Sequence, residues 1–166
     1  ATAPGTYTLT VTNTANGCTA TDAVTISQNI TPPVANTGTN QTLTCANTSF
    51  VVGTAAISGN TYSWSPSAGL SANNIAQPNA TAPGTYTLTV TTTANGCTAT
   101  DAVTISQNIT PPVANAGTNQ TLTCANTSFV IGTTAVAGNT YTWSPSVGLS
   151  ANNIAQPNAT APGTYT

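Results

Sequence analysis

Four cysteines and two aspartates are the side chains of this 166-residue sequence best suited to covalent, metal-binding or acid–base chemistry. The sequence has no Lys, Arg or His. Catalysis by proton transfer or by nucleophilic attack needs ionisable groups held close together, with a base to activate the nucleophile. No such set can be drawn from these residues. We therefore expect no catalytic residue, no cofactor and no enzymatic activity.

The reactive residues recur at one interval. Cys18 and Cys97 are 79 residues apart, and so are Asp22 and Asp101. Aligned over one interval, residues 1–79 and 80–158 differ at eight positions: 13, 37, 52, 55, 57, 58, 63 and 68 of the first copy. A period this long is typical of an array of small domains rather than of a solenoid, whose units are shorter.

The cysteines favour disulfide bonds over a metal site. Zinc sites usually contain closely spaced C-x-x-C pairs, and none is present. Two cysteines per period in a Thr-rich chain without His are typical of a secreted disulfide protein. The disulfide candidates are Cys18, Cys45, Cys97 and Cys124.

The sequence leaves three states of these cysteines open: a disulfide within one unit, a disulfide between units, or free thiols. A bond between Cys45 and Cys97 within one unit is favoured. It would close a long loop and stabilise the fold by about 4 kcal/mol in the chain-entropy model. If the strand before Cys45 runs parallel to the last strand, however, the two cysteines lie roughly 30 Å apart. The bond would then join neighbouring units instead. Free thiols are the third state.

Each aspartate stands alone in the pattern "ATDAV", near the middle of an expected strand. Calcium sites usually gather several carboxylate oxygens, and each period has only one carboxylate. A surface carboxylate hydrogen-bonded to a nearby Thr is therefore favoured over a calcium ligand. No metal site is predicted.

Alternation of apolar residues with Thr predicts an all-β fold. In Gly84–Thr91, Tyr86, Leu88 and Val90 face one way and the Thr residues the other. Asn95-Gly96 is a hairpin signal before a last strand over residues 97–107. Further strands are expected over residues 41–45, 49–53 and 61–65, with a loop from Pro66 to Asn74. About seven short antiparallel strands per period would form tandem Ig-like or PKD-like β-sandwiches.

Aromatic side chains are expected in the core of each unit. A Trp on the third strand of a sandwich usually lies at its centre. A sugar-stacking platform is the alternative for Trp64 and Tyr62. The expected core aromatics are Trp64, Trp143, Tyr62 and Tyr86.

Prolines mark the domain boundaries. The Thr31-Pro32-Pro33 run is the best linker candidate, since Pro is excluded from central strands. Residues 1–29 are then expected to be the last strands of a preceding repeat and residues 30–108 one complete repeat. Residues 109–166 would be most of a following repeat that stops inside a strand.

Charge and hydropathy narrow the choice of partners. The formal net charge is −2, without any Lys or Arg to neutralise phosphates. Nucleic-acid binding is therefore not expected. Insertion into a membrane is not expected either, because no apolar run approaches the roughly 20 residues that a spanning helix needs. Solubility must come from hydroxyls, amides or attached sugar. Candidate N-x-S/T glycosylation sites begin at Asn29, Asn40, Asn47, Asn79, Asn108, Asn119, Asn126 and Asn158.

The segment "PGTYTLTVTTTANGCTATDAVTI" over residues 83–105, with "YTWSPSVGLS" over 141–150, resembles a known class of repeat. It is similar to the PKD-like and Ig-like repeats of large secreted surface adhesins of Bacteroidota. Those adhesins include gliding-type adhesins exported by type IX secretion. The similarity spans the whole 79-residue unit, but "WSPSAGLS" at Trp64–Ser71 replaces the PKD signature WDFGDG. The resemblance implies a β-sandwich at the bacterial cell surface.

Two functions follow as hypotheses. The leading hypothesis is a non-catalytic structural repeat of an extracellular filament or adhesin stalk, with further copies of the repeat as partners. The alternative is an adhesive module whose loops, such as Pro66–Gln77, bind surface glycans weakly and gain avidity from repetition.

Overall fold

The computed structural model describes all residues from 1 to 166 and divides into two compact units, residues 1–109 and 110–166. It contains strands, turns and loops without any helix, which confirms the all-β prediction. No helix is therefore available that could span a membrane. The strands are β1 Gly5–Thr12, β2 Thr19–Ile26, β3 Gln41–Thr44, β4 Phe50–Val51, β5 Asn60–Ser65, β6 Asn79–Ala80, β7 Gly84–Thr92, β8 Thr98–Asn108, β9 Phe129–Val130 and β10 Asn158–Ala159.

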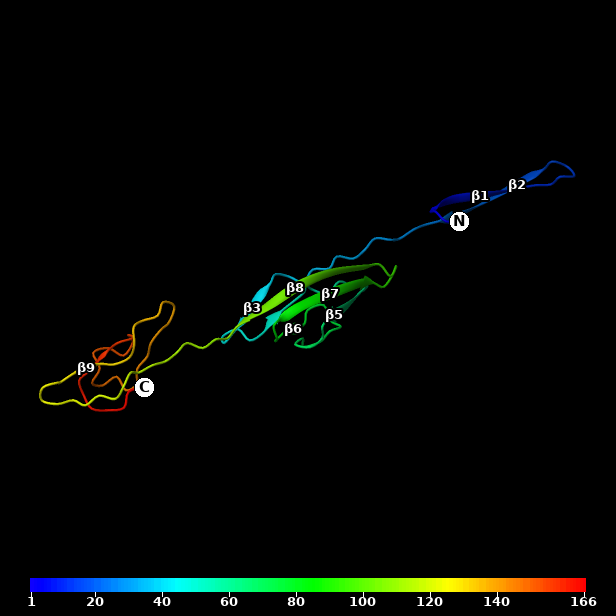
Figure 1. Ribbon diagram of the computed structural model, residues 1–166. Coiled ribbons are helices and arrows are strands. Elements are labelled where there is room, and N and C mark those ends of the chain that lie inside the picture. Colours follow the sequence, from blue (N-terminus) through cyan, green and yellow to red (C-terminus); the bar gives the residue numbers. More distant parts are fainter. The chain divides into compact units, whose positions relative to one another are not determined.

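A four-stranded sheet organises residues 41–108, in the order β3-β8-β7-β5 (Figure 1). Strands β7 and β8 form an antiparallel hairpin across the Asn95-Gly96 turn. Gly96 supplies the positive φ of +72° that such a turn needs, and its N–H donates to the carbonyl of Thr92 at 2.8 Å. The hairpin signal in the sequence thus corresponds to a real hairpin.

The edge strand β3 differs from the antiparallel expectation. It runs parallel to β8, with Gln41 opposite Ile105 and Thr44 opposite Asn108. A parallel partner needs a long crossover connection, and residues 45–97 provide it. Residues 30–108 also hold six strands rather than about seven, because β4 and β6 shorten to a two-residue pair.

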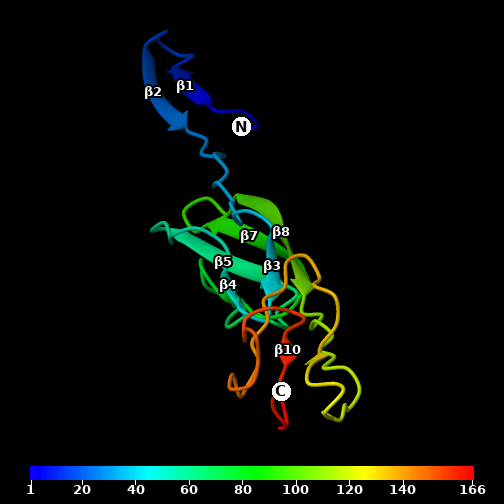
Figure 2. The same ribbon diagram turned by 90° about the vertical axis from the view of Figure 1, so that its left-hand side faces the viewer.

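Alternation along the strands builds one core. The inward residues of β7 are buried, while its Thr residues lie on the opposite, more accessible face. Figure 2 shows β7 and β8 side by side in this sheet. Burial of each large apolar side chain contributes about 1.5–3 kcal/mol, so these positions dominate the stability. The core residues are Leu43, Val52, Trp64, Ala80, Tyr86, Leu88, Val90, Val103 and Ile105.

Strands β1 and β2 form a two-stranded sheet with the same internal register as β7 and β8. Gly5 pairs with Ile26, as Gly84 pairs with Ile105. All residues of β1 and β2 are exposed. The local sequence is therefore sufficient for the hairpin register in this structure.

Residues 110–166 repeat part of the first unit. The β9–β10 pair matches β4–β6, and the Ile131 N–H donates to Pro157 at 3.0 Å as Val52 does to Pro78. Segments equivalent to β3 and β5 are present but are not assigned as strands. In the first unit, β3 pairs with β8 and β5 pairs with β7, and residues 110–166 contain no such partner strands.

Candidate functional site

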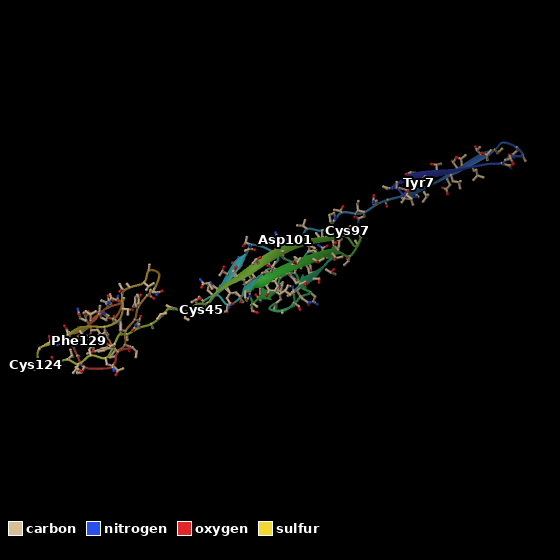
Figure 3. The ribbon with its side chains drawn as sticks, in the orientation of Figure 1. Tyr7, Cys45, Cys97, Asp101, Cys124 and Phe129 are labelled. Carbon is tan, nitrogen blue, oxygen red and sulfur yellow. The ribbon has the colours of Figure 1, made fainter.

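Asp101 is the one carboxylate of the first unit that another segment holds in place. It lies on β8 (Figure 3). The backbone N–H and the hydroxyl of Thr37 both donate to its Oδ2, each at 2.8 Å. Thr37 is buried to 1% exposure in the segment before β3. The contact therefore fastens this segment to the central strand of the sheet.

The same hydrogen bonds set the protonation of Asp101. They hold the pKa of its carboxyl below the usual value of an aspartate, with the Thr37 backbone N–H contributing most, then the Thr37 hydroxyl, then the Ala102 N–H. Desolvation acts in the opposite direction on this pKa and is the weakest contribution. Asp101 is thus an ionised carboxylate that accepts hydrogen bonds, as the favoured interpretation of the sequence had it.

No cluster of three or more His, Cys, Asp or Glu side chains gathers anywhere in the structure. Asp22, the counterpart of Asp101, accepts a hydrogen bond only from the Ala23 N–H, at 2.8 Å. The two aspartates therefore have the same sequence context and different surroundings.

Trp64 lies in the core, 2% exposed, and its indole N–H donates to the carbonyl of Ile75 at 2.9 Å. Trp143 makes the equivalent bond to Ile154 at 2.9 Å and is 8% exposed. An indole buried as deeply as that of Trp64 has no free ring face on which a sugar could stack. Tyr62 is partly buried against the core, and its hydroxyl oxygen accepts the Ile57 N–H.

The segment "TAPGTYT" forms the same small turn three times. The Tyr86 hydroxyl donates to the carbonyl of Ala82 at 2.9 Å, four residues upstream. The equivalent bonds run from Tyr7 to Ala3 and from Tyr165 to Ala161. A tyrosine hydroxyl that bonds back to the upstream backbone is a corner device of β-sandwiches. It also forms where the surrounding strands are missing.

All four cysteines are free. Cys97 precedes β8, while Cys45 follows β3, whose last residue pairs with the last residue of β8. The two cysteines therefore lie at opposite ends of an 11-residue strand, as Figure 3 shows. Such a strand spans roughly 33 Å, whereas the Cα atoms of a disulfide lie about 6 Å apart. The favoured Cys45–Cys97 bond within one unit was wrong.

Residues 30–108, the expected complete repeat, contact the segments that flank them at opposite ends of β8. The Asn95 side chain beside the β7–β8 turn donates to Asn29 at 3.1 Å and to the carbonyl of Thr31 at 3.0 Å. At the other end, the Cys45 thiol lies 3.8 Å from the carbonyl of Ile109. The chain therefore enters the unit beside the turn and leaves it beside Cys45.

The eight candidate glycosylation sites are all exposed. The side chains of two of them accept hydrogen bonds: the oxygen of Asn29 accepts the Asn95 side-chain N–H at 3.1 Å, and the oxygen of Asn40 accepts the Thr104 N–H at 2.8 Å. The amide nitrogen of Asn40, the atom that glycosylation would modify, donates no hydrogen bond within the protein.

Sequence reasoning missed Thr37 and Asn95. Thr37 is one of the eight positions where the copies differ, with Ala116 as its counterpart. Such a difference could have marked the position, but nothing in the pattern indicated its contact with a strand 64 residues away. The sequence indicates only a turn at Asn95, because the contact of this side chain with residues 29–31 depends on tertiary structure.

No protein-family profile matches this sequence, and a search of curated proteins finds no match either.

Proposed function

We propose that this chain is a non-catalytic structural repeat of an extracellular filament or adhesin stalk. The proposal rests on where the two flanking linkers contact residues 30–108. The Asn95 turn contacts the linker at residues 29–31, and Cys45 contacts Ile109 at the far end of an 11-residue strand. A unit whose linkers leave from opposite ends adds length each time it is repeated.

The repeated unit itself is proposed to be an Ig-like β-sandwich. The four-stranded sheet, the β4–β6 pair and the shared core between them support this assignment. So does the tyrosine corner at Tyr86. The resemblance to repeats of Bacteroidota surface adhesins supports the proposal of an extracellular location. The near absence of charge and of reactive side chains is compatible with a mechanical role there.

The proposal is tested by adding copies of residues 30–108 to one chain and measuring its maximum dimension by X-ray scattering. Each unit is expected to add roughly 30–40 Å, the length of its longest strand with a linker. A chain of six copies whose maximum dimension hardly exceeds that of two copies would contradict a filament role.

The glycan-binding alternative rests on the loop Pro66–Gln77. In the structure this loop is fixed by the backbone N–H of Trp64, which donates to the carbonyl of Asn73, and by the burial of Ala76. A fixed loop is compatible with binding, but no contact in it favours a sugar. The structural role is therefore the one that we propose.

A further inference from the structure

The β7–β8 turn contains a pair of residues, Asn95 and Gly96, that can react with each other. The backbone nitrogen that follows an asparagine can attack the side-chain carbonyl carbon of that asparagine and expel its amide nitrogen. Glycine permits this attack most readily, because it has no Cβ to crowd the nitrogen and its backbone angles are the least restricted. The other asparagines of residues 30–108 all precede larger residues. Asn95 is therefore the asparagine of this segment that is most open to spontaneous deamidation.

The structure holds the Asn95 side chain as a flat, intact amide. Its Nδ2 donates to the Oδ1 of Asn29 at 3.1 Å and to the carbonyl of Thr31 at 3.0 Å. Its Oδ1 accepts the Cys97 N–H at 2.9 Å, and the Gly96 N–H donates a hydrogen bond across the turn at 2.8 Å. Attack would make the amide carbon tetrahedral and move both side-chain atoms away from these partners. Hydrogen bonds that are present before the reaction and lost during it slow the reaction.

The reaction would in turn remove the contact with the linker. The Gly96 nitrogen forms a bond to Cγ of Asn95, the Cγ–Nδ2 bond breaks, and Nδ2 leaves as ammonia with the proton of the Gly96 N–H. Water then opens the cyclic imide and leaves a carboxylate, attached through the normal or the β-linked backbone. A carboxylate has acceptor oxygens only. The carbonyl of Thr31 would then face a second acceptor instead of an N–H donor.

We infer that Asn95 is a deamidation site coupled to the linker: its contact with residues 29–31 slows the reaction, and the reaction releases the linker irreversibly. Both effects follow from one atom, because Nδ2 is the leaving group of the reaction and also the donor to the linker. Water is the only co-reactant. The inference concerns one contact of the chain and holds whether or not the chain forms filaments.

The slowing effect is tested on the full 166-residue chain by following deamidation at mildly alkaline pH with peptide mass spectrometry. Asn29→Ala removes one of the two linker acceptors and should speed the deamidation of Asn95 about threefold to tenfold. Asn29→Asp is the matched control, because it removes the same amide but keeps an acceptor oxygen, and it should react no faster than the original chain. Thr92 distinguishes the Asn95 peptide from the Asn16 peptide, which has Asn13 at the equivalent position.

The release of the linker is tested with Asn95→Asp, which has the side chain of the deamidated product. It keeps the oxygen that accepts the Cys97 N–H and removes both N–H donors to the linker. Asp-Gly is also a favoured hairpin turn, so the β7–β8 hairpin should remain. NMR order parameters of the Asn29 and Thr31 amides should fall from about 0.85, typical of rigid backbone, to below about 0.6.

Ala94→Asp is the matched control for this second experiment. Ala94 is exposed, and the variant adds the same charge one residue away while keeping the Asn95 donors. Its order parameters at residues 29 and 31 should equal those of the original chain.

Two results would overturn the inference. Equal deamidation rates of Asn29→Ala and Asn29→Asp would show that the linker does not slow the reaction. Unchanged order parameters in Asn95→Asp would show that loss of the amide does not release the linker. Neither result bears on the filament role, since scattering by chains with several repeats tests that role separately.

Discussion

Thr37 and Ala116 show how one hydroxyl distinguishes otherwise similar repeats. Thr37 gives two hydrogen bonds to the Asp101 carboxylate and fastens the segment before β3 to β8. Ala116 has no hydroxyl to give. Hydrogen bonds to a charged group contribute about 1.5–3 kcal/mol, so this contact is a measurable part of the stability of a small domain.

Thr37→Ala is predicted to destabilise the complete unit by about 1–2 kcal/mol, because the backbone N–H of residue 37 still reaches Asp101. Thr37→Ser keeps the hydroxyl and should recover most of the loss. Urea unfolding of both variants, with hydrogen exchange of the β8 amides to localise the effect, measures the difference. Equal stability of the Ala and Ser variants would show that the hydroxyl is unimportant.

The lowered pKa of Asp101 predicts a pH dependence. A carboxyl whose pKa is lower in the folded than in the unfolded state stabilises the fold fully above the unfolded value, about 3.9 for Asp. This stabilisation is lost as the pH falls through the lower, folded pKa. The free energy of unfolding should therefore decline below about pH 4, and less steeply in Thr37→Ala. Parallel pH profiles for the two chains would contradict this account.

Substitutions at two glycines allow the cost of backbone strain to be measured separately from the cost of a steric collision. Gly53 and Gly59 both have positive φ, +86° and +80°. A Cβ on Gly53 would collide with the carbonyl oxygen of Ala76 and touch Trp64, while one on Gly59 would meet nothing within 4 Å. Gly59→Ala should cost about 1–2 kcal/mol from strain alone, and Gly53→Ala clearly more. Equal midpoints of urea unfolding for the two variants would exclude the predicted collision at residue 53.

At the scale of elements, alternation predicted the long strands well. The expected strand over 84–91 is β7 at Gly84–Thr92, and the one over 61–65 is β5 at Asn60–Ser65. Each of these has enough residues for period-2 alternation to show. The two-residue strand β6 is too short to show alternation, and it is defined by its pairing with β4 and by the bridge between Ala80 and Leu70.

The alternation of apolar and polar residues could not predict the direction of β3. The alternation in Gln41–Thr44 identifies which side chains point inward, but it is the same for a parallel and an antiparallel partner. The favoured cysteine pairing depended on this direction and failed with it. The contact between Thr37 and Asp101 was likewise hidden, because it joins a loop and a strand far apart in the sequence.

The sheet topology predicts the outcome of disulfide mapping. After oxidation of chains with several repeats, no peptide linking Cys45 to Cys97 of the same repeat should form. Because Cys45 and the Asn95 turn each contact a linker, a bond between successive repeats is the pairing we expect. Chains with a single complete repeat should stay free of the within-unit bond and serve as the control. Recovery of a 45–97 peptide from them would contradict the observed register.

At the scale of the whole molecule, the contacts of residues 30–108 with both flanking segments support the proposed structural role. Because the linkers contact opposite ends of residues 30–108, each added copy would lengthen the chain. This proposed role needs neither an ionisable active-site group nor a bound cofactor.

The most direct test of this account is electron microscopy of a chain with many copies of residues 30–108, in which the axial spacing between units is measured. The account predicts extended particles with one regular spacing of roughly 30–40 Å per 79-residue repeat. Compact particles without an axial repeat would contradict it.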